Sequence, residues 1–199
     1  MKRILLLLLL LIVACTPVIK ESSSLNSVLQ RFAVLDAQYG TNWQNNTFGA
    51  DIPLSRLHEL ENILQNDTYT LNDSKNIMLA LLTASRGLMV KSQAEFAQAY
   101  AYGPQSIANL PTHGIKLGQT YSVSCANTDV YAQVADLYEH AIFNAKQSAK
   151  AFGEAQRFAL PSERLAIQVP VFYRTDYTQI EDAIKGNRVA VKNCEAENK

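Results

Sequence analysis

The segment from Asn72 to Gly103-Pro104 constrains the fold more than any other part of this sequence, because it predicts one long, deeply buried helix. Asn72 or Asp73 is suited to cap its start, and the glycine–proline pair ends it. The stretch from Ile77 to Leu82 is apolar on every side, which is typical of a helix surrounded by other elements. The pattern continues through Ala84, Leu88, Ala94, Phe96 and Tyr100. An internal glycine, Gly87, costs about 1 kcal/mol of helix propensity, and it indicates a close approach by a neighbouring helix.

Five other segments show the three-and-four residue spacing of amphipathic helices. The first has serines 22–24 as caps and Gly40 as its stop, and the second starts at Pro53. A long helix opens at Thr128 and a short one covers Ser162 to Gln168. The last helix begins near Asp176, and its inward face carries Tyr177, Ile180, Ile184, Val191 and Cys194. The sequence therefore predicts an all-α fold, a single bundle of about six helices that occupies residues 25–199.

Residues 103–127 lack helical periodicity, and a loop of that length is uncommon in a compact domain unless it is functional or locally ordered. The apolar residues between Ile115 and Cys125 alternate with period two, as do Val169, Val171 and Tyr173. Such alternation is typical of strands. It predicts a small two-stranded ribbon between these two segments.

The chain opens with MKRILLLLLLLIVAC, in which a short basic start precedes an apolar run from Ile4 to Ala14. The run is too short to span a membrane, which takes about 20 residues, but it fits an export signal. Its end, Ile12-Val13-Ala14-Cys15, resembles the lipobox of bacterial-type lipoproteins. The resemblance implies cleavage before Cys15 and a diacylglyceryl group on its thiol. Residues 1–14 would be the signal and 15–24 a flexible tether; the alternative is an ordinary secretory signal with a chance cysteine.

The same resemblance bears on location. Lipoproteins of this kind lie outside the cytoplasm on a membrane, and Thr16 is not the aspartate that retains many of them at the inner membrane. An envelope with two membranes would then place this chain on the outer membrane, at its periplasmic face.

Two cysteines remain once Cys15 is acylated, namely Cys125 and Cys194. An even pair in an oxidising compartment predicts a disulfide, and packing of the fourth and last helices would bring the two thiols to one end of the domain. Closing a loop of about 70 residues stabilises a fold by about 4 kcal/mol. The alternative is two separately buried thiols.

Composition and motifs exclude several classes of function. Without the signal, sixteen basic residues face eighteen acidic ones, so no basic face for nucleic acid is expected. The sequence has no P-loop, dinucleotide fingerprint, nucleophile elbow or zinc-protease motif, and it predicts no cofactor and no metal. Asp136 and His140 lie four residues apart on one helical face and could share a metal, but a solvated hydrogen bond is the simpler interpretation of that pair. An enzyme ranks third among the hypotheses.

Aromatic residues around the long loop are the best candidates for ligand binding, because tyrosine combines a flat apolar ring with a polar tip. Arg86, inside the apolar helix, could meet a ligand carboxylate, although an arginine in such a place more often extends to the surface. The alternative for the tyrosines is packing in the core. The full candidate set is Arg86, Tyr100, Tyr102, His113, Tyr121, Tyr131 and Tyr138.

Residues 51–90 pair a leucine-rich amphipathic segment with an apolar one, DIPLSRLHELENILQNDTYTLNDSKNIMLALLTASRGLMV. This pattern resembles the first helical pair of TRAP-transporter-associated T-component lipoproteins. The resemblance implies a homo-oligomer that works with an extracytoplasmic solute-binding protein. No site residue is carried over from it.

The favoured hypothesis is a non-enzymatic, membrane-tethered module that binds or assembles a protein partner of the cell envelope. The second is a small-ligand carrier or transport accessory, with its pocket near the 103–127 loop and the two long helices on either side of it.

Overall fold

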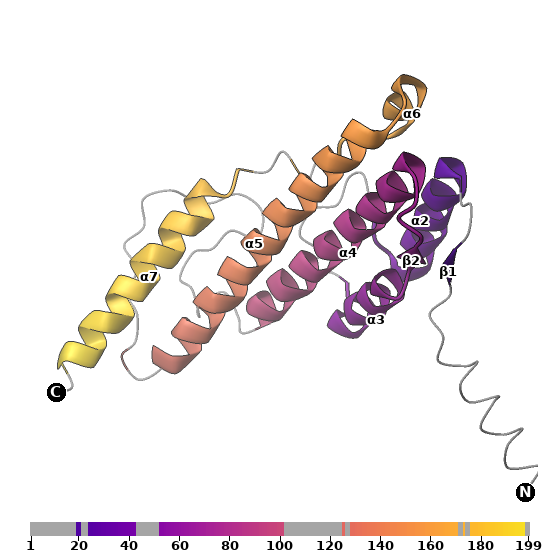
Figure 1. Cartoon of the computed structure of the whole chain (residues 1–199). Helices are drawn as coiled ribbons and strands as arrows, with labels where there is room; N and C mark the ends of the chain where they lie inside the picture. Colours follow the sequence, from indigo (N-terminus) through magenta and orange to yellow (C-terminus); the bar gives the residue numbers. More distant parts are fainter. Residues whose placement is uncertain are drawn as a thin grey trace, which may run out of the picture.

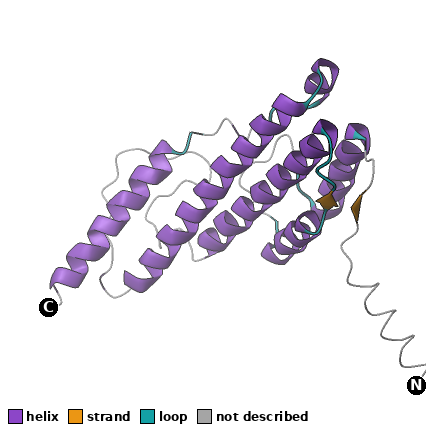
Figure 2. Ribbon diagram, in the orientation of Figure 1, coloured by secondary structure: helices purple, strands orange, loops and turns teal. Residues whose placement is uncertain are grey.

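The computed structural model describes residues 19–20, 24–42, 52–101, 125, 128–170, 173 and 176–197. Six helices and two short strands lie within these ranges (Figure 1). The elements are β1 (Ile19–Lys20), α2 (Leu25–Tyr39), α3 (Leu54–Gln65), β2 (Thr68–Tyr69), α4 (Ser74–Ala101), α5 (Thr128–Phe158), α6 (Pro161–Ala166) and α7 (Thr178–Glu197). Nearly all of the described chain is helix, so the predicted all-α bundle of about six helices is confirmed (Figure 2).

The helix ends follow local chemistry. The Ser24 hydroxyl accepts a hydrogen bond from the Ser27 N–H at 3.1 Å, which caps α2. Gly40 ends the same helix with φ of 75°, a left-handed conformation that glycine adopts without strain. The Asp73 carboxylate accepts from the Asn76 N–H at 2.7 Å at the start of α4. These are the ends that the sequence predicts.

Helix α4 occupies the middle of the bundle. It packs against α3 on one side and α5 on the other, and α7 covers the far side of α5 (Figure 1). Helices α4 and α5 are antiparallel, since Ser85 lies beside Ser148 and Ser92 beside Ala141. Helix α2 completes the arrangement next to α3 and α4.

The buried apolar residues within the described ranges extend from Leu25 to Cys194. The centre of α4 contributes Met78, Leu79, Leu82, Met89 and Val90, none of which has exposed surface. Between Asn76 and Ala99 every residue of α4 except Ala84 is buried or half-buried, which explains why this helix carries almost no polar face. No helix in the described part of the chain has the length and apolar character needed to cross a membrane.

Two details differ from the sequence predictions. Ile19 and Lys20, expected within a flexible tether, form β1, which runs parallel to β2 with Ile19 opposite Thr68 and Lys20 opposite Tyr69. The short connection between α3 and α4 therefore contains a strand. The ribbon predicted between 115–125 and 169–173 falls largely outside the described residues, as does the signal at 1–14.

Candidate functional site

Three hydroxyl groups form a polar cluster in the contact between α4 and α5. Ser85 Oγ donates to the Ser148 carbonyl at 2.9 Å, and Ser148 Oγ donates to the Ser85 carbonyl at 2.5 Å. The Tyr173 hydroxyl lies 2.5 Å from Ser85 Oγ and 2.8 Å from Ser148 Oγ. Burial raises the pKa of Tyr173, against the opposing effect of its serine partners. These reciprocal bonds hold the two long helices together.

The cluster does not assemble acid–base chemistry among the described residues. A serine nucleophile needs a base that takes its proton, and here each serine proton points to a carbonyl of the facing helix. The two histidines that the structure describes, His58 and His140, are both exposed at the surface. We therefore interpret the cluster as a structural clamp.

Arg86 lies next to this clamp with only 1% of its surface exposed. Its guanidinium forms an ion pair with Asp36 of α2 and donates to the Thr41 hydroxyl at 2.9 Å. Burial lowers the pKa of Arg86, and the charge of Asp36 acts in the opposite direction. The carboxylate that Arg86 binds thus belongs to this chain. The expectation that Arg86 extends to the surface is wrong, because the packing of α2 on α4 provides an internal partner.

Gln93 is a second polar side chain buried on α4, two turns beyond Arg86. It has no exposed surface, and neither its amide nitrogen nor its amide oxygen has a hydrogen-bond partner within the described ranges. A buried amide in that state costs about 1–3 kcal/mol. Gln93 therefore shares one face of α4 with Arg86, and its amide offers N–H donors and a carbonyl acceptor there.

The other predicted site residues are dispersed. Tyr131 is buried at the start of α5, and Tyr138 is half-buried with its ring centroid 5.6 Å from that of Phe96. Both therefore pack in the core, as the alternative interpretation held. Tyr100 belongs to α4, but its side chain is not among those the structure describes. Cys15, Tyr102, His113 and Tyr121 lie outside the described residues.

The predicted disulfide is formed. Cys125 and Cys194 are bonded, and their Cα atoms are 5.3 Å apart. The bridge joins the start of α5 to the end of α7, which places both thiols at one end of the bundle as expected. Asp136, considered for a metal, instead pairs with Arg188 of α7 at 2.7 Å, and no metal-ligand cluster occurs in the part of the chain that is described.

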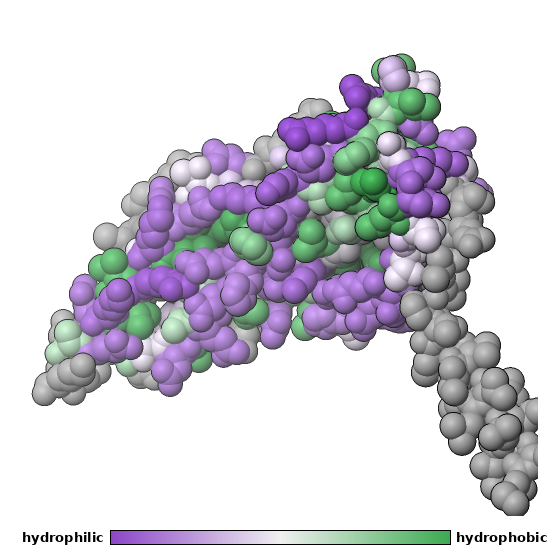
Figure 3. All heavy atoms as spheres, in the orientation of Figure 1, coloured by the Kyte–Doolittle hydropathy of each residue, from purple (hydrophilic) through white to green (hydrophobic). Residues whose placement is uncertain are grey.

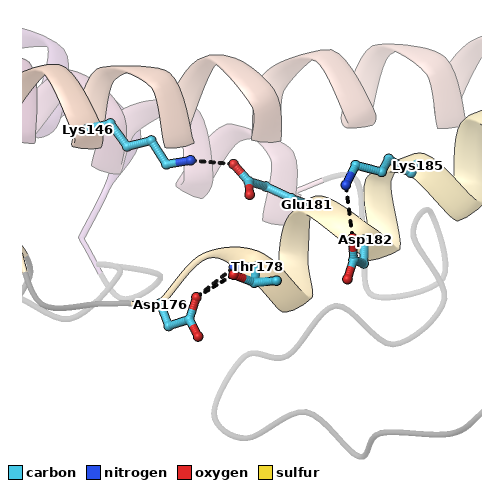
Figure 4. A network of polar contacts seen from close by, with 6 residues as sticks. All are labelled: Lys146, Asp176, Thr178, Glu181, Asp182 and Lys185. Carbon is cyan, nitrogen blue, oxygen red and sulfur yellow. Dashed lines mark hydrogen bonds and ion pairs between the residues drawn. The ribbon is translucent and has the colours of Figure 1, made fainter.

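A groove lies between α5 and α7, with a volume of about 560 Å³. Phe143 in its wall is 60% exposed, and Lys146 of α5 bridges to Glu181 of α7 at 2.5 Å. Figure 4 shows this bridge together with the Lys185–Asp182 pair, 3.0 Å apart. Lys146 and Glu181 pair across the groove, and its two basic lining residues, Lys146 and Lys185, are matched by two acidic ones, Glu139 and Glu181. The groove is therefore a mixed apolar and ionic surface without excess charge.

A second groove, the α3–α4 groove, has a volume of about 520 Å³ and is mainly apolar. Its apolar walls come from α3, α4 and the β2 segment. Green apolar surface is visible over this region of the molecule (Figure 3). The apolar lining residues are Leu64, Tyr69, Leu71, Ala80, Ala84, Gly87 and Leu88, with Lys91 among the polar ones.

An exposed apolar tip lies where α5 ends and α6 begins. We define it as Phe158, Leu160, Leu165 and Val169; Leu160 is 63% exposed and Leu165 85%. Glu163 accepts a hydrogen bond from the Leu160 N–H at 2.8 Å, which fixes the turn. Figure 1 shows α6 at the far end of α5, past the start of α4. The tip presents two large leucines at the end of the longest helix in the described chain.

Sequence reasoning missed the clamp, Gln93 and the tip. Ser85, Ser148 and Gln93 interrupt otherwise apolar helical stripes, and such interruptions are a usable signal for buried polar contacts. Leu165 sits in a helix with no apolar periodicity, which indicates exposure. The pairing of Ser85 with Tyr173 had no local signal.

Comparison with protein-family models, with curated proteins and with solved structures found no match to this chain.

Proposed function

We propose that this chain is a lipoprotein anchored outside the cytoplasm through an acylated Cys15, and that its helical domain binds a partner protein of the cell envelope. The exposed tip at α6 carries the binding part of this proposal. The leader sequence supports the anchor, and the disulfide is consistent with an oxidising compartment. Membrane attachment confines the domain to the surface where its partner works.

The tip has the character of a protein-docking surface. Interfaces typically combine a few large apolar anchors with a charged rim. Leu160 and Leu165 are such anchors, and Arg157 and Arg164 lie beside them in sequence and are exposed. Ala159 and Ile167 on either side of them are buried, so the segment that carries the exposed leucines is packed against the core.

The strand pair bears on how the tip is oriented relative to the proposed anchor at Cys15. From β2 the chain continues to the start of α4, which is the end of the bundle that carries α6. Because β1 is parallel to β2, Ile19, the first residue of β1, lies at the end of that strand directed away from the start of α4. An anchor at Cys15 would then leave the tip facing away from the membrane, toward a protein partner.

Crosslinking in intact cells tests the docking surface. A photo-crosslinkable residue in place of Leu165 should give one discrete protein adduct, and the change Leu160→Asp should abolish it. The same crosslinker in place of Val189, an exposed apolar residue of α7, is the matched control. Equal adducts at both positions, or none at Leu165, would contradict the proposal.

Intact mass tests the anchor separately. The mature chain should begin at Cys15 and carry the added mass of a diacylglyceryl group, and Cys15→Ser should carry none. A mature chain that starts elsewhere with a free thiol would exclude the lipoprotein.

The second candidate is a small-ligand carrier or transport accessory. Gln93 favours it, because a buried amide without a partner in the described chain suits a polar ligand group. Native mass spectrometry of the gently purified protein should then show one defined extra mass, which Gln93→Leu removes. A spectrum without any bound ligand would contradict the carrier function and leave protein binding as the remaining candidate.

A further inference from the structure

The α3–α4 groove offers an apolar surface of a kind that suits a hydrocarbon chain. Leu64, Ala84 and Leu88 line it from two helices, and Leu71 at its edge is 66% exposed. Two polar lining residues form a hydrogen bond with each other, since the Tyr69 and Thr83 hydroxyls are 2.9 Å apart. The other polar lining residues are Gln65, Asp67, Thr68 and Lys91, and Asp67 forms an ion pair with Arg31 of α2. The lining is nevertheless mainly aromatic and aliphatic.

The strand pair fixes the start of the chain beside this groove. Ile19 of β1 lies opposite Thr68, which is itself a lining residue. Cys15 precedes Ile19 by four residues, and four extended residues span at most about 14 Å. An acyl group on Cys15 is therefore always held close to the groove, at a high effective concentration.

We infer that the α3–α4 groove binds one acyl chain of the lipid carried by Cys15, an inference that rests on the proposed acylation. One chain in the groove leaves fewer chains for the bilayer. A single acyl chain gives only marginal, reversible membrane binding, whereas two anchor a protein stably. The groove thus makes attachment reversible, so that the lipoprotein can pass from one membrane surface to another.

Transfer between vesicles tests this inference on the acylated full-length mature protein. The protein is placed in vesicles of phosphatidylethanolamine and phosphatidylglycerol, and its transfer to empty vesicles of the same composition is timed. Ala84→Trp fills the groove from an exposed position, and it should slow transfer at least about tenfold by returning the acyl chain to the bilayer. Ala33→Trp, exposed on α2 away from the groove, should transfer at the wild-type rate.

Intact mass and a free probe separate the possible failures. A mature chain without lipid overturns the anchor and this inference together. An acylated chain with equal transfer rates in wild type and Ala84→Trp overturns the groove alone. Dansyl-undecanoic acid should bind the unacylated Cys15→Ser protein, and Ala84→Trp in that background should abolish binding. Circular dichroism of each variant confirms folding, and binding of the probe by folded Ala84→Trp protein would also overturn the inference.

Discussion

Arg86 brings a guanidinium into the core of the bundle, and Asp36 is the group that makes its burial tolerable. An isolated charge in an apolar interior costs several kcal/mol, which the ion pair and the Thr41 hydrogen bond offset. The same contacts fix α2 on α4. A single side chain therefore sets both the electrostatics of the core and the position of a helix.

Removing the partner charge should destabilise the fold strongly. Asp36→Asn leaves Arg86 buried without its counter-charge, and we expect the free energy of unfolding to fall by about 3–5 kcal/mol. Urea denaturation measures it. Asp182→Asn is the matched control, because it breaks an exposed pair with Lys185 that should contribute less than about 1 kcal/mol. Similar losses in the two variants would contradict the role of Arg86.

Glu95 gives the fold a dependence on pH. Burial raises the pKa of Glu95, and the Asn144 side chain, which donates to it at 2.7 Å, acts in the opposite direction. The folded state then holds the proton more tightly than the unfolded state. Protonated Glu95 therefore contributes its full stabilisation to the fold at pH values below the pKa that Glu95 has in the unfolded chain. This stabilisation is lost as pH rises through the pKa that Glu95 has in the folded protein.

Glu95→Gln should remove this dependence while its amide oxygen still accepts from Asn144. The variant should be more stable than the wild type at pH 7, and the difference should shrink as pH falls toward 4. Urea denaturation at both pH values checks it, with the exposed Glu195→Gln as control. A difference in the free energy of unfolding between variant and wild type that stays constant across this pH range would refute the role of Glu95.

At the scale of the elements, the contact between α4 and α5 combines small residues with paired polar groups. Ser85 and Ser148 are short enough for each hydroxyl to reach the opposite backbone, and Ser92 repeats this contact with the Ala141 carbonyl at 2.7 Å. Each of these bonds requires one relative position of the two helices along their axes. The serines therefore specify the register of the helix pair, which apolar packing alone would leave less defined.

Gly87 lies in the contact between α4 and α3, where the sequence predicts a close approach. A Cβ at Gly87 would meet Leu64 Cβ at 3.7 Å, which is an ordinary van der Waals distance. Gly87→Ala should therefore fit, and it should raise the free energy of unfolding by about 0.5–1 kcal/mol through helix propensity. Gly153→Ala in α5, where the added Cβ meets open space, should give a similar gain. A loss at Gly87 alone, measured by thermal denaturation, would show that α3 needs the glycine.

At the scale of the whole molecule, the disulfide between Cys125 and Cys194 joins two segments that are far apart in the sequence. It links the start of α5 to the end of α7. The same two helices are also joined by exposed ion pairs such as Lys146–Glu181. Exposed ion pairs contribute little to stability. The covalent link therefore acts together with the buried apolar residues Ile180, Ile184 and Val191 to keep α7 on the bundle.

Loss of the bridge should lower the free energy of unfolding by about 4 kcal/mol, as expected for a loop of this size. Urea denaturation of Cys125→Ser/Cys194→Ser should match that of the wild type under reducing conditions. Free thiols detected in the unreduced wild type would contradict the bridge.

Local features of the sequence were enough to predict the helices. Ser24, Asp73 and Gly40 act within a few residues of their own positions, so both ends of α2 and the start of α4 could be inferred without the fold. Apolar spacing identified the buried face of each helix for the same reason. The paired cysteines could be predicted because the expected helical domain, residues 25–199, contains two, and both fall near helix ends.

The sequence by itself determined the all-α class, the ends of the helices and the paired cysteines, because capping and helical spacing are local properties. Only the tertiary structure decided that Arg86 binds Asp36, that Tyr173 joins Ser85 and Ser148, and that β1 pairs with β2. These contacts join residues separated by 25 to 88 positions, and each depends on how one element is placed against another. No local pattern specifies that placement, since it results from packing over the whole bundle.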